Sequence, residues 1–307
     1  MRKKFAIFGA NGFIGSNLVD RLSRSAEVKA VDLYHKPATF EVNRNVKIIK
    51  SNLAEGDKII ADIGADKLDG IVWAVGGLIP ADELGDEVKV FEIIEPTIRL
   101  MKAFIERKIP IILTSSAGML YSQRKVPLGE NDKVDPWTWY GLQKLVIEKS
   151  LRLLSRSANN NLMKILRITS VYGERQPTDR DQGVIAKLFR SAIKKEPFVL
   201  YGSENARRDY VYVGDLAKII EIFLTKETEY PMYNVSTGSG KTLKEVRKII
   251  ENITGNKIKI IRKDKRDIDP SHIDVSNRRL LKELKRFQFA DLEEGLKKTY
   301  YWFEKSL

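Results

Sequence analysis

The chain has 307 residues, of which 43% are hydrophobic and 31% charged, and this balance is typical of folded globular proteins. It contains no cysteine and only two histidines, His35 and His272, which excludes disulfides and cysteine-based metal centres, and we expect no metal site. The formal net charge of +13 comes largely from scattered lysines and arginines, and the densest basic run, Lys257 to Arg266, has no aromatic side chain, so we expect no nucleic-acid partner.

No apolar run in the sequence reaches the length of about 18 residues that a membrane-spanning helix needs. The apolar run after the basic residues Arg2 to Lys4 ends at Gly9, which is too short for the core of a signal peptide. Together with the lack of cysteine, these observations predict a protein of the reducing cytoplasm that does not insert into a membrane.

The first half of the chain alternates short apolar runs with longer segments of helical spacing. Strands are predicted at Phe5–Phe8, Val28–Asp32, Val46–Ile49, Gly70–Val75, Ile109–Thr114 and Leu162–Ile168. Helices are predicted at Ile14–Ser23, Leu53–Ile63, Glu87–Glu106 and Trp139–Leu154. This alternation is typical of a parallel sheet that is covered on both faces. The sequence therefore predicts an α/β protein with a Rossmann-type doubly wound sheet.

After Ser170 the loops lengthen and the pattern becomes less regular. Helices are predicted at Val184–Lys194, Leu216–Thr225, Leu243–Ile253 and Leu292–Phe303, and strands at Met232–Val235 and Lys257–Ile261. We therefore expect a dinucleotide-binding domain in residues 1–170 and a smaller α/β substrate lobe in residues 171–307. The two are expected to be interleaved, with later strands and helices added to the first domain, and to share a cleft.

A glycine-patterned turn, Gly9-Ala-Asn-Gly12-Phe-Ile-Gly15, separates the first predicted strand from the first predicted helix. The first glycine permits a tight turn, the second lets backbone N–H groups approach a pyrophosphate, and the third allows helix and strand to pack closely. The anion would lie at the helix N-terminus, where free N–H groups and the helix dipole favour negative charge. The turn therefore predicts a dinucleotide site.

Asp32 ends the second predicted strand, at the place where such sites carry an acidic residue. A carboxylate there accepts hydrogen bonds from both ribose hydroxyls of adenosine, and it would repel a 2′-phosphate. Positions 31 to 34 contain no lysine or arginine, although Lys36 lies close by. The pattern favours NAD over NADP as the cofactor.

A second pattern joins the end of the fifth strand, Thr114-Ser115-Ser116, to Tyr140 and Lys144 at the head of a helix. Tyr140 and Lys144 are one turn apart on one helix face. A nearby ammonium and a positive nicotinamide ring both favour the phenolate, and Ser116 can hydrogen-bond the reacting oxygen. These groups predict hydride transfer with a proton relay, with Ser116, Tyr140 and Lys144 as catalytic residues and Ser115 as the alternative to Ser116.

The glycine spacing, Asp32 and the Tyr140–Lys144 pair resemble the extended short-chain dehydrogenase/reductase superfamily, and within it the NAD-dependent epimerase/dehydratase family that acts on nucleotide-sugars. The resemblance extends over nearly the whole chain. It aligns Ser116, Tyr140 and Lys144 with the catalytic triad of the superfamily. The expected cofactor contacts are Gly9, Asn11, Gly12, Phe13, Ile14, Gly15, Asp32, Leu33, Asn52, Leu53, Ala74, Val75, Gly76, Thr114, Tyr140 and Lys144.

The C-terminal half carries the expected substrate contacts. Arg208-Asp209 resembles a family motif whose arginine contacts the nucleotide diphosphate, and a planar guanidinium matches phosphate oxygens. The resemblance implies substrate binding by Ser116, Ser170, Arg208 and Arg266. Asp209 and Asp215 are interpreted as structural, as an arginine partner and a helix N-cap. Leu78 stands where well-known hexose epimerases have a lysine, so the motifs do not select one sugar or one nucleotide.

Ala117 and Gly118 occupy the place where the 4,6-dehydratases of the family carry an Asp-Glu acid/base pair, and neither can transfer a proton. Dehydration is therefore disfavoured. A nucleotide-sugar 4-epimerase is favoured by the NAD preference and the Tyr–Lys pair, and a nucleotide-keto-sugar reductase is the alternative. A non-catalytic dinucleotide-binding regulator is disfavoured because Tyr140 and Lys144 are both present.

The predicted helices Glu87–Glu106 and Tyr140–Leu154 resemble those that pair two subunits of the family as a four-helix bundle. The expected partners are therefore a nucleotide-diphosphate sugar, as substrate, and a second copy of the chain in a homodimer.

Overall fold

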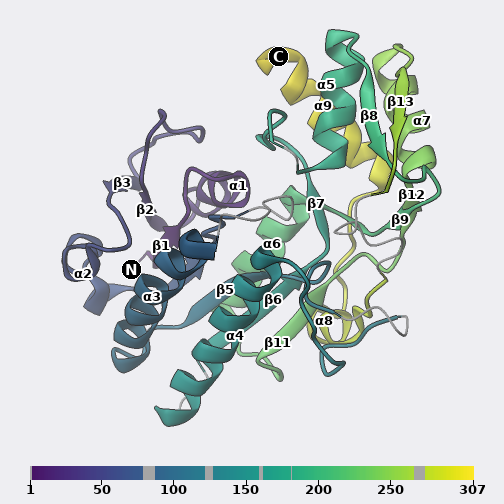
Figure 1. The fold of residues 1–307 in the computed structure, drawn as a ribbon. Coiled ribbons are helices and arrows are strands. Elements are labelled where there is room, and N and C mark those ends of the chain that lie inside the picture. The colour runs from purple at the N-terminus through teal and green to yellow at the C-terminus, as the bar shows by residue number, and fades with distance from the viewer. Residues whose placement is uncertain (1, 79–86, 122–126, 159–161, 181, 266–273) are drawn as a thin grey trace.

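A sheet of seven parallel strands, in the order β11-β6-β5-β4-β1-β2-β3, forms the centre of the molecule (Figure 1). The computed structural model describes residues 2–78, 87–121, 127–158, 162–180, 182–265 and 274–307. The strands are β1 (Lys4–Phe8), β2 (Glu27–Asp32), β3 (Val46–Lys50), β4 (Gly70–Trp73), β5 (Ile111–Ser116), β6 (Met163–Ile168) and β11 (Met232–Val235). The order 3-2-1-4-5-6 within it is that of the doubly wound dinucleotide-binding fold, which confirms the predicted fold class.

Helices cover both faces of the sheet. The side chains on both faces of the central strands are therefore buried, as in β1, where all but the first residue is buried, and in β4, where every residue is. One face packs against α1 (Phe13–Leu22) and α6 (Val213–Thr225). The other packs against α2 (Gly56–Ile63), α3 (Glu87–Glu106) and α4 (Trp139–Ser157), with α3 and α4 side by side (Figure 1). A short 3-10 helix, η1 (Ala65–Lys67), follows α2, and α8 (Arg278–Leu284) packs against β11.

A smaller lobe is built around its own apolar core by α5 (Val184–Lys194), α7 (Leu243–Thr254) and α9 (Leu292–Ser306). Its strands form three pairs: β7 (Ser170–Tyr172) with β10 (Tyr210–Tyr212), β8 (Phe198–Tyr201) with β13 (Ile260–Lys263), and β9 (Arg207–Arg208) with β12 (Lys241–Thr242). A capping box between Thr242 and Glu245 starts α7, because each side chain bonds the other's backbone N–H.

Three elements from the C-terminal half, α6, β11 and α8, belong to the large sheet layer. The strand β11 pairs in parallel with β6, and α6 packs against α1. The chain therefore leaves the sheet after β6, returns to it at α6 and β11, and then completes the smaller lobe with α7, β13 and α9 (Figure 1).

Three of the predicted strands have ends that are wrong by two residues or more, and one of them, predicted at Lys257–Ile261, lies at Ile260–Lys263. The strand predicted at Gly70–Val75 ends at Trp73, because its partner β1 ends at Phe8 and the chain then turns toward Gly77, whose φ is +83°. The strand predicted at Ile109–Thr114 begins at Ile111 and continues to Ser116, since β6 pairs with it as far as Ile168. Within the described part of the chain, no helix has the length and apolarity to cross a bilayer.

Candidate active site

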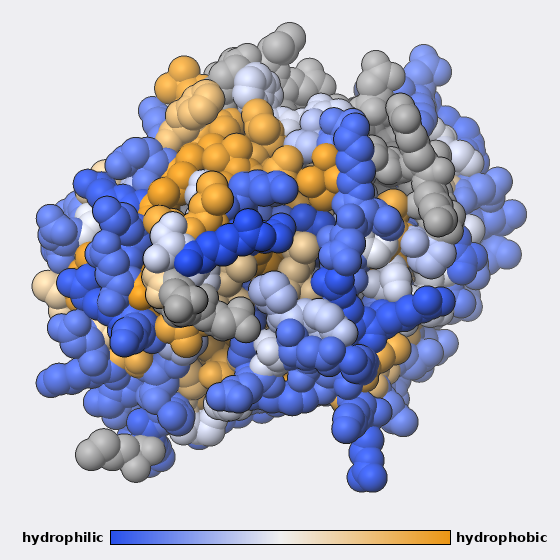
Figure 2. Space-filling view, turned by 90° about the horizontal axis from the view of Figure 1, so that it is seen from below, coloured by the Kyte–Doolittle hydropathy of each residue, from blue (hydrophilic) through white to orange (hydrophobic). Residues whose placement is uncertain are grey.

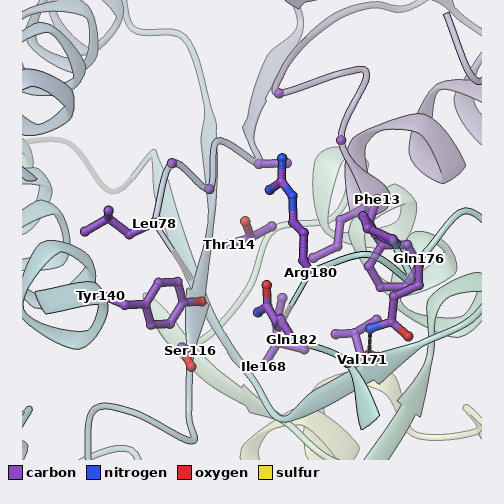
Figure 3. Close-up of a pocket in the computed structure, with 18 of the residues that line it drawn as sticks. Phe13, Leu78, Thr114, Ser116, Tyr140, Ile168, Val171, Gln176, Arg180 and Gln182 are labelled. Atoms are coloured by element: carbon purple, nitrogen blue, oxygen red, sulfur yellow. Dashed lines mark hydrogen bonds between the residues drawn. The ribbon is translucent and has the colours of Figure 1, made fainter. Parts of the chain in front are cut away.

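A cleft of about 1800 Å³ runs from the carboxyl ends of the sheet strands to the smaller lobe (Figure 3). The structure brings nearly all of the predicted site residues to its wall. Those that line it are Gly9, Asn11, Gly12, Phe13, Ile14, Asp32, Leu33, Asn52, Leu53, Ala74, Val75, Gly76, Thr114, Ser115, Ser116, Tyr140, Lys144, Ser170 and Arg208. Gly15 does not line the cleft, and Arg266 lies outside the described residues.

The glycine turn depends on close backbone contacts. Gly9 has a φ of +77°, and a Cβ there would lie 2.7 Å from the carbonyl oxygen of Ala74. A Cβ on Gly15 would lie 2.0 Å from the carbonyl oxygen of Gly9, so α1 packs directly against the turn. Gly15 therefore lets α1 pack against the turn, and this contact holds the turn between β1 and α1 at the cleft wall.

The N-terminus of α1 fits the pyrophosphate of a dinucleotide. Gly12 is the N-cap, no side chain within the described chain caps this helix, and its first turn contains no acidic residue. The first N–H groups of the helix therefore face the cleft without a side-chain acceptor, and the helix dipole favours an anion there. At the end of β2, the Asp32 carboxylate accepts hydrogen bonds from the backbone N–H of Asn11 (2.9 Å) and Leu33 (2.7 Å), which orients it at the same cleft.

The N-terminal end of α4 carries the predicted tyrosine and lysine. The helix begins at Trp139, and the Thr138 side chain caps it by accepting a hydrogen bond from Gly141 N at 3.1 Å. A Cβ on Gly141 would lie 2.4 Å from the carbonyl oxygen of Met119, so this glycine lets the helix approach the segment after β5. Gly141 was not predicted as part of the site, and its contact is visible only in three dimensions.

Lys144 is held between the ends of β4 and β5. Its Nζ donates hydrogen bonds to the carbonyl oxygens of Val75 (3.0 Å) and Thr114 (3.4 Å), and the side chain is buried. Burial lowers the pKa of Lys144 to about 8, and the negative charge of Glu148, one turn further along α4, opposes this shift. A largely desolvated ammonium therefore stands at the base of the cleft.

Tyr140 and Ser116 meet at the cleft wall. Figure 3 shows the Tyr140 ring beside Leu78, with its hydroxyl directed into the cavity near Ser116. Burial raises the pKa of Tyr140, and a hydrogen bond from Ser116 acts in the opposite direction. Lys144 Nζ lies 5.8 Å from the centre of the Tyr140 ring, so its ammonium stands near the phenol while it donates its hydrogen bonds to carbonyl oxygens.

Two aspartates outside the reactive centre are structural, but not in the predicted way. Asp209 accepts hydrogen bonds from Thr169, Thr237 and Ser239 rather than from an arginine. Asp215 lies within the first turn of α6, whose N-cap is Tyr212, and its carboxylate accepts a hydrogen bond from the N–H of Ala290. The Asp209 carboxylate therefore holds the loop after β11 beside β9, and this contact positions the neighbouring Arg208 at the cleft.

Polar residues that the motifs did not single out line the same cleft. They come from the loop after β7, from α5 and from β8, and are Arg175, Arg180, Gln182, Lys187 and Tyr201. Figure 3 shows Arg180 and Gln182 reaching into the cavity opposite Tyr140. No local spacing marks these residues, since they share the cleft only through the packing of the smaller lobe on the sheet.

The order of the sheet and the cleft at its carboxyl edge define a dinucleotide-binding enzyme. Residues 5–236 match the model of the NAD dependent epimerase/dehydratase family, and the chain belongs to that family. It is therefore an enzyme with NAD as its cofactor, and the non-catalytic regulator is set aside.

Relatives of known structure and name agree with this assignment. The UDP-glucose 4-epimerase of Thermotoga maritima, solved with UDP-glucose, is 25% identical, covers 99% of each chain and superposes with a TM-score of 0.90. The UDP-N-acetylglucosamine 4-epimerase of Methanobrevibacter ruminantium is 26% identical, with 100% and 99% coverage and a TM-score of 0.88. The dTDP-4-dehydro-6-deoxyglucose reductase of Escherichia coli is 26% identical over 95% of both chains.

Proposed function

We propose that the protein is an NAD-dependent nucleotide-sugar 4-epimerase. The observation that carries the proposal is the meeting of Ser116, Tyr140 and Lys144 at one point of a cleft that extends from the α1 N-terminus to Arg208. A nucleotide-sugar bound by its diphosphate at Arg208 would present its sugar ring to Tyr140. The names of the similar epimerases support the same reaction.

In this mechanism Tyr140 is the group that takes the proton from the sugar 4-hydroxyl and later returns it. Ser116 lies beside the phenol and is proposed to donate a hydrogen bond to the reacting oxygen when the substrate is present. When bound, NAD would supply the acceptor for the C4 hydride and a positive charge that favours the phenolate. Lys144, whose Nζ lies 5.8 Å from the centre of the Tyr140 ring, adds a second positive charge near the phenol.

The C4 hydride and the hydroxyl proton leave together in the first half of the reaction and produce a 4-keto sugar. Such a reaction would consume no oxidant or reductant, because the hydride removed from C4 and the proton taken by Tyr140 would both be returned to the sugar, on its opposite face. Ala117 and Gly118 follow Ser116 and have no acid or base, which disfavours the competing loss of water. Ser170 and Arg208 are proposed to hold the substrate.

Because the chain is also similar to the Escherichia coli reductase, reduction of a keto sugar is the second candidate reaction, and one experiment distinguishes it from epimerisation. Purified protein is incubated with a panel of UDP- and dTDP-hexoses without added cofactor, and the sugar signals are followed by NMR. The proposal expects one or more of them to be converted into its C4 epimer. If no sugar is converted until NADH and a 4-keto substrate are both added, the protein is a reductase and the epimerase proposal is wrong.

We also propose that the protein forms a homodimer through α3 and α4. The exposed apolar side chains of these helices are Val88, Phe91 and Leu153, with 65%, 63% and 62% of their surface exposed. Figure 2 shows the molecule from below relative to the view of Figure 1. A broad apolar area lies there where these helices face the viewer. An apolar area on a paired-helix surface is typical of a subunit interface.

Leu153→Glu is expected to dissociate this dimer, because it places a charge among apolar side chains at the contact. Val42 is also exposed but lies between β2 and β3 and not on α3 or α4, and it provides the control variant Val42→Glu. Light scattering should give the mass of two chains for the unaltered protein and for Val42→Glu, and of one chain for Leu153→Glu. A single-chain mass for the unaltered protein at micromolar concentration would contradict the dimer.

A further inference from the structure

The segment 36–41, here called the strap, follows β2 and runs along the cofactor end of the cleft, where Lys36 and Thr39 line the wall. Asn11, in the glycine turn, holds the first part of the strap. Its amide nitrogen donates to the carbonyl oxygens of Lys36 (3.2 Å) and Pro37 (3.1 Å), and its amide oxygen accepts from Thr39 N (2.9 Å). Asn11 thus binds the strap with its side chain, in addition to lining the cleft.

The second part of the strap is held from α1 and from the substrate side. Asp20, on α1, accepts a hydrogen bond from Glu41 N at 2.8 Å. Arg175, in the loop after β7, donates from Nε to the carbonyl oxygen of Thr39 at 2.7 Å. The same guanidinium pairs with the Asp20 carboxylate and donates to Asn17 Oδ1 at 3.2 Å, so one planar group joins the strap to α1.

The Arg175–Asp20 pair is only partly exposed, with 18% and 21% of the two side chains accessible. Salt therefore screens it less than it screens a surface pair. Arg175 also has a φ of +66°, a left-handed conformation that a non-glycine residue adopts at a cost. The guanidinium of this residue nevertheless makes hydrogen bonds to the strap and to α1.

The loop that carries Arg175 is in turn anchored to the smaller lobe and to α1. Glu174, the preceding residue, accepts a hydrogen bond from the hydroxyl of Tyr212 at 2.6 Å. Its carbonyl oxygen accepts one from the Asn17 side chain at 2.9 Å. Among the hydrogen bonds to the strap in the described part of the chain, the one from Arg175 comes from the C-terminal half, and it connects the substrate side of the cleft to the cofactor side.

We propose that Arg175 is a positioning residue that latches the strap over the cofactor end of the cleft, so that NAD stays bound while a keto sugar turns over in the site. The latch concerns NAD retention, and its value to the reaction rests on the proposed epimerase function. An epimerase returns the hydride to the molecule from which it was taken, so cofactor lost between the two steps leaves an unfinished product. A latch from the substrate loop slows that loss.

The test uses Arg175→Met, which keeps the length of the side chain and removes its donors. The full-length protein is loaded with isotope-labelled NAD and chased with unlabelled NAD, and the release rate is measured. Loss of charge-assisted hydrogen bonds is expected to raise this rate about 10-fold to 100-fold. In the cofactor-free protein, hydrogen exchange at the amides of Thr39 and Glu41 should also accelerate.

Arg21→Met is the matched control. Arg21 follows Asp20 on α1 and pairs with Glu221 at 2.7 Å, with 31% and 30% of the side chains exposed, but it does not touch the strap. Its release rate is expected to equal that of the unaltered protein. If Arg175→Met does not fold, Asp20→Asn replaces it, since the amide still accepts from Glu41 N but no longer pairs with the guanidinium.

An unchanged NAD release rate in Arg175→Met would overturn the latch, and so would an equal acceleration in Arg21→Met. Neither measurement requires turnover of a sugar. An unchanged NAD release rate would therefore not contradict the epimerase proposal. An epimerase assay without product would likewise not contradict the role of Arg175 in NAD retention.

Discussion

Tyr140→Phe is expected to lower kcat about 100-fold to 10,000-fold, because it removes the only group proposed to exchange a proton with the sugar hydroxyl. The ring remains, so the variant should fold and retain its NAD. Epimerisation is measured by NMR at saturating substrate, and bound NAD is determined after the protein is denatured.

Tyr34→Phe is the control for this variant. The Tyr34 hydroxyl donates to the carbonyl oxygen of Ala30 at 3.1 Å, and the residue does not line the cleft, so the same loss of a phenol should leave kcat unchanged. More than half of the normal activity in Tyr140→Phe, with NAD still bound, would remove this tyrosine from the mechanism.

Lys144→Met is expected to lower kcat by about 100-fold or more and also to change how stability depends on pH. Burial lowers the pKa of Lys144 to about 8, whereas the same group in the unfolded chain titrates near its ordinary value. Below pH 8 the buried ammonium destabilises the folded state in full. This cost fades as the pH rises from about 8 to above 10, since the folded protein has then already released the proton.

The free energy of unfolding of the unaltered protein should therefore rise relative to Lys144→Met over that range, by an amount on the order of 3 kcal/mol. Urea unfolding at pH 7 and pH 10.5 provides the comparison. Arg21→Met, which has no comparable shift of a buried lysine, should show a constant difference. A constant difference for Lys144→Met as well would mean that Lys144 is not desolvated as the structure places it.

Local patterns predicted the part of the site that is built from contiguous segments. Gly9 and Gly12 lie between a buried strand and a helix, Gly15 lies in the first turn of that helix, and all three belong to one short contiguous segment. The one-turn spacing of Tyr140 and Lys144 places both on one face of α4 whatever else surrounds the helix. The class of fold, a parallel sheet with helices on both faces, also follows from the strand–helix alternation.

Contacts between distant segments could not be predicted in this way. Arg175 and Asp20 are 155 residues apart, and nothing near either one in the sequence indicates the other. The strands β9 and β12 have two residues each, too few for a periodic pattern. The raised pKa of Tyr140 depends on how deeply the packed cleft buries its hydroxyl, which composition and spacing do not report.

The most direct test of the account follows the hydrogen at C4. A nucleotide-sugar that the protein turns over is prepared with deuterium at this carbon and incubated with the purified protein in ordinary water, without added cofactor. Transfer to tightly held NAD and back predicts that the epimeric product keeps its deuterium at C4, with none released to solvent. Product that carries ordinary hydrogen at C4 would show that the inversion occurs by proton exchange, and the assignment of Tyr140, Lys144 and NAD to a hydride relay would be wrong.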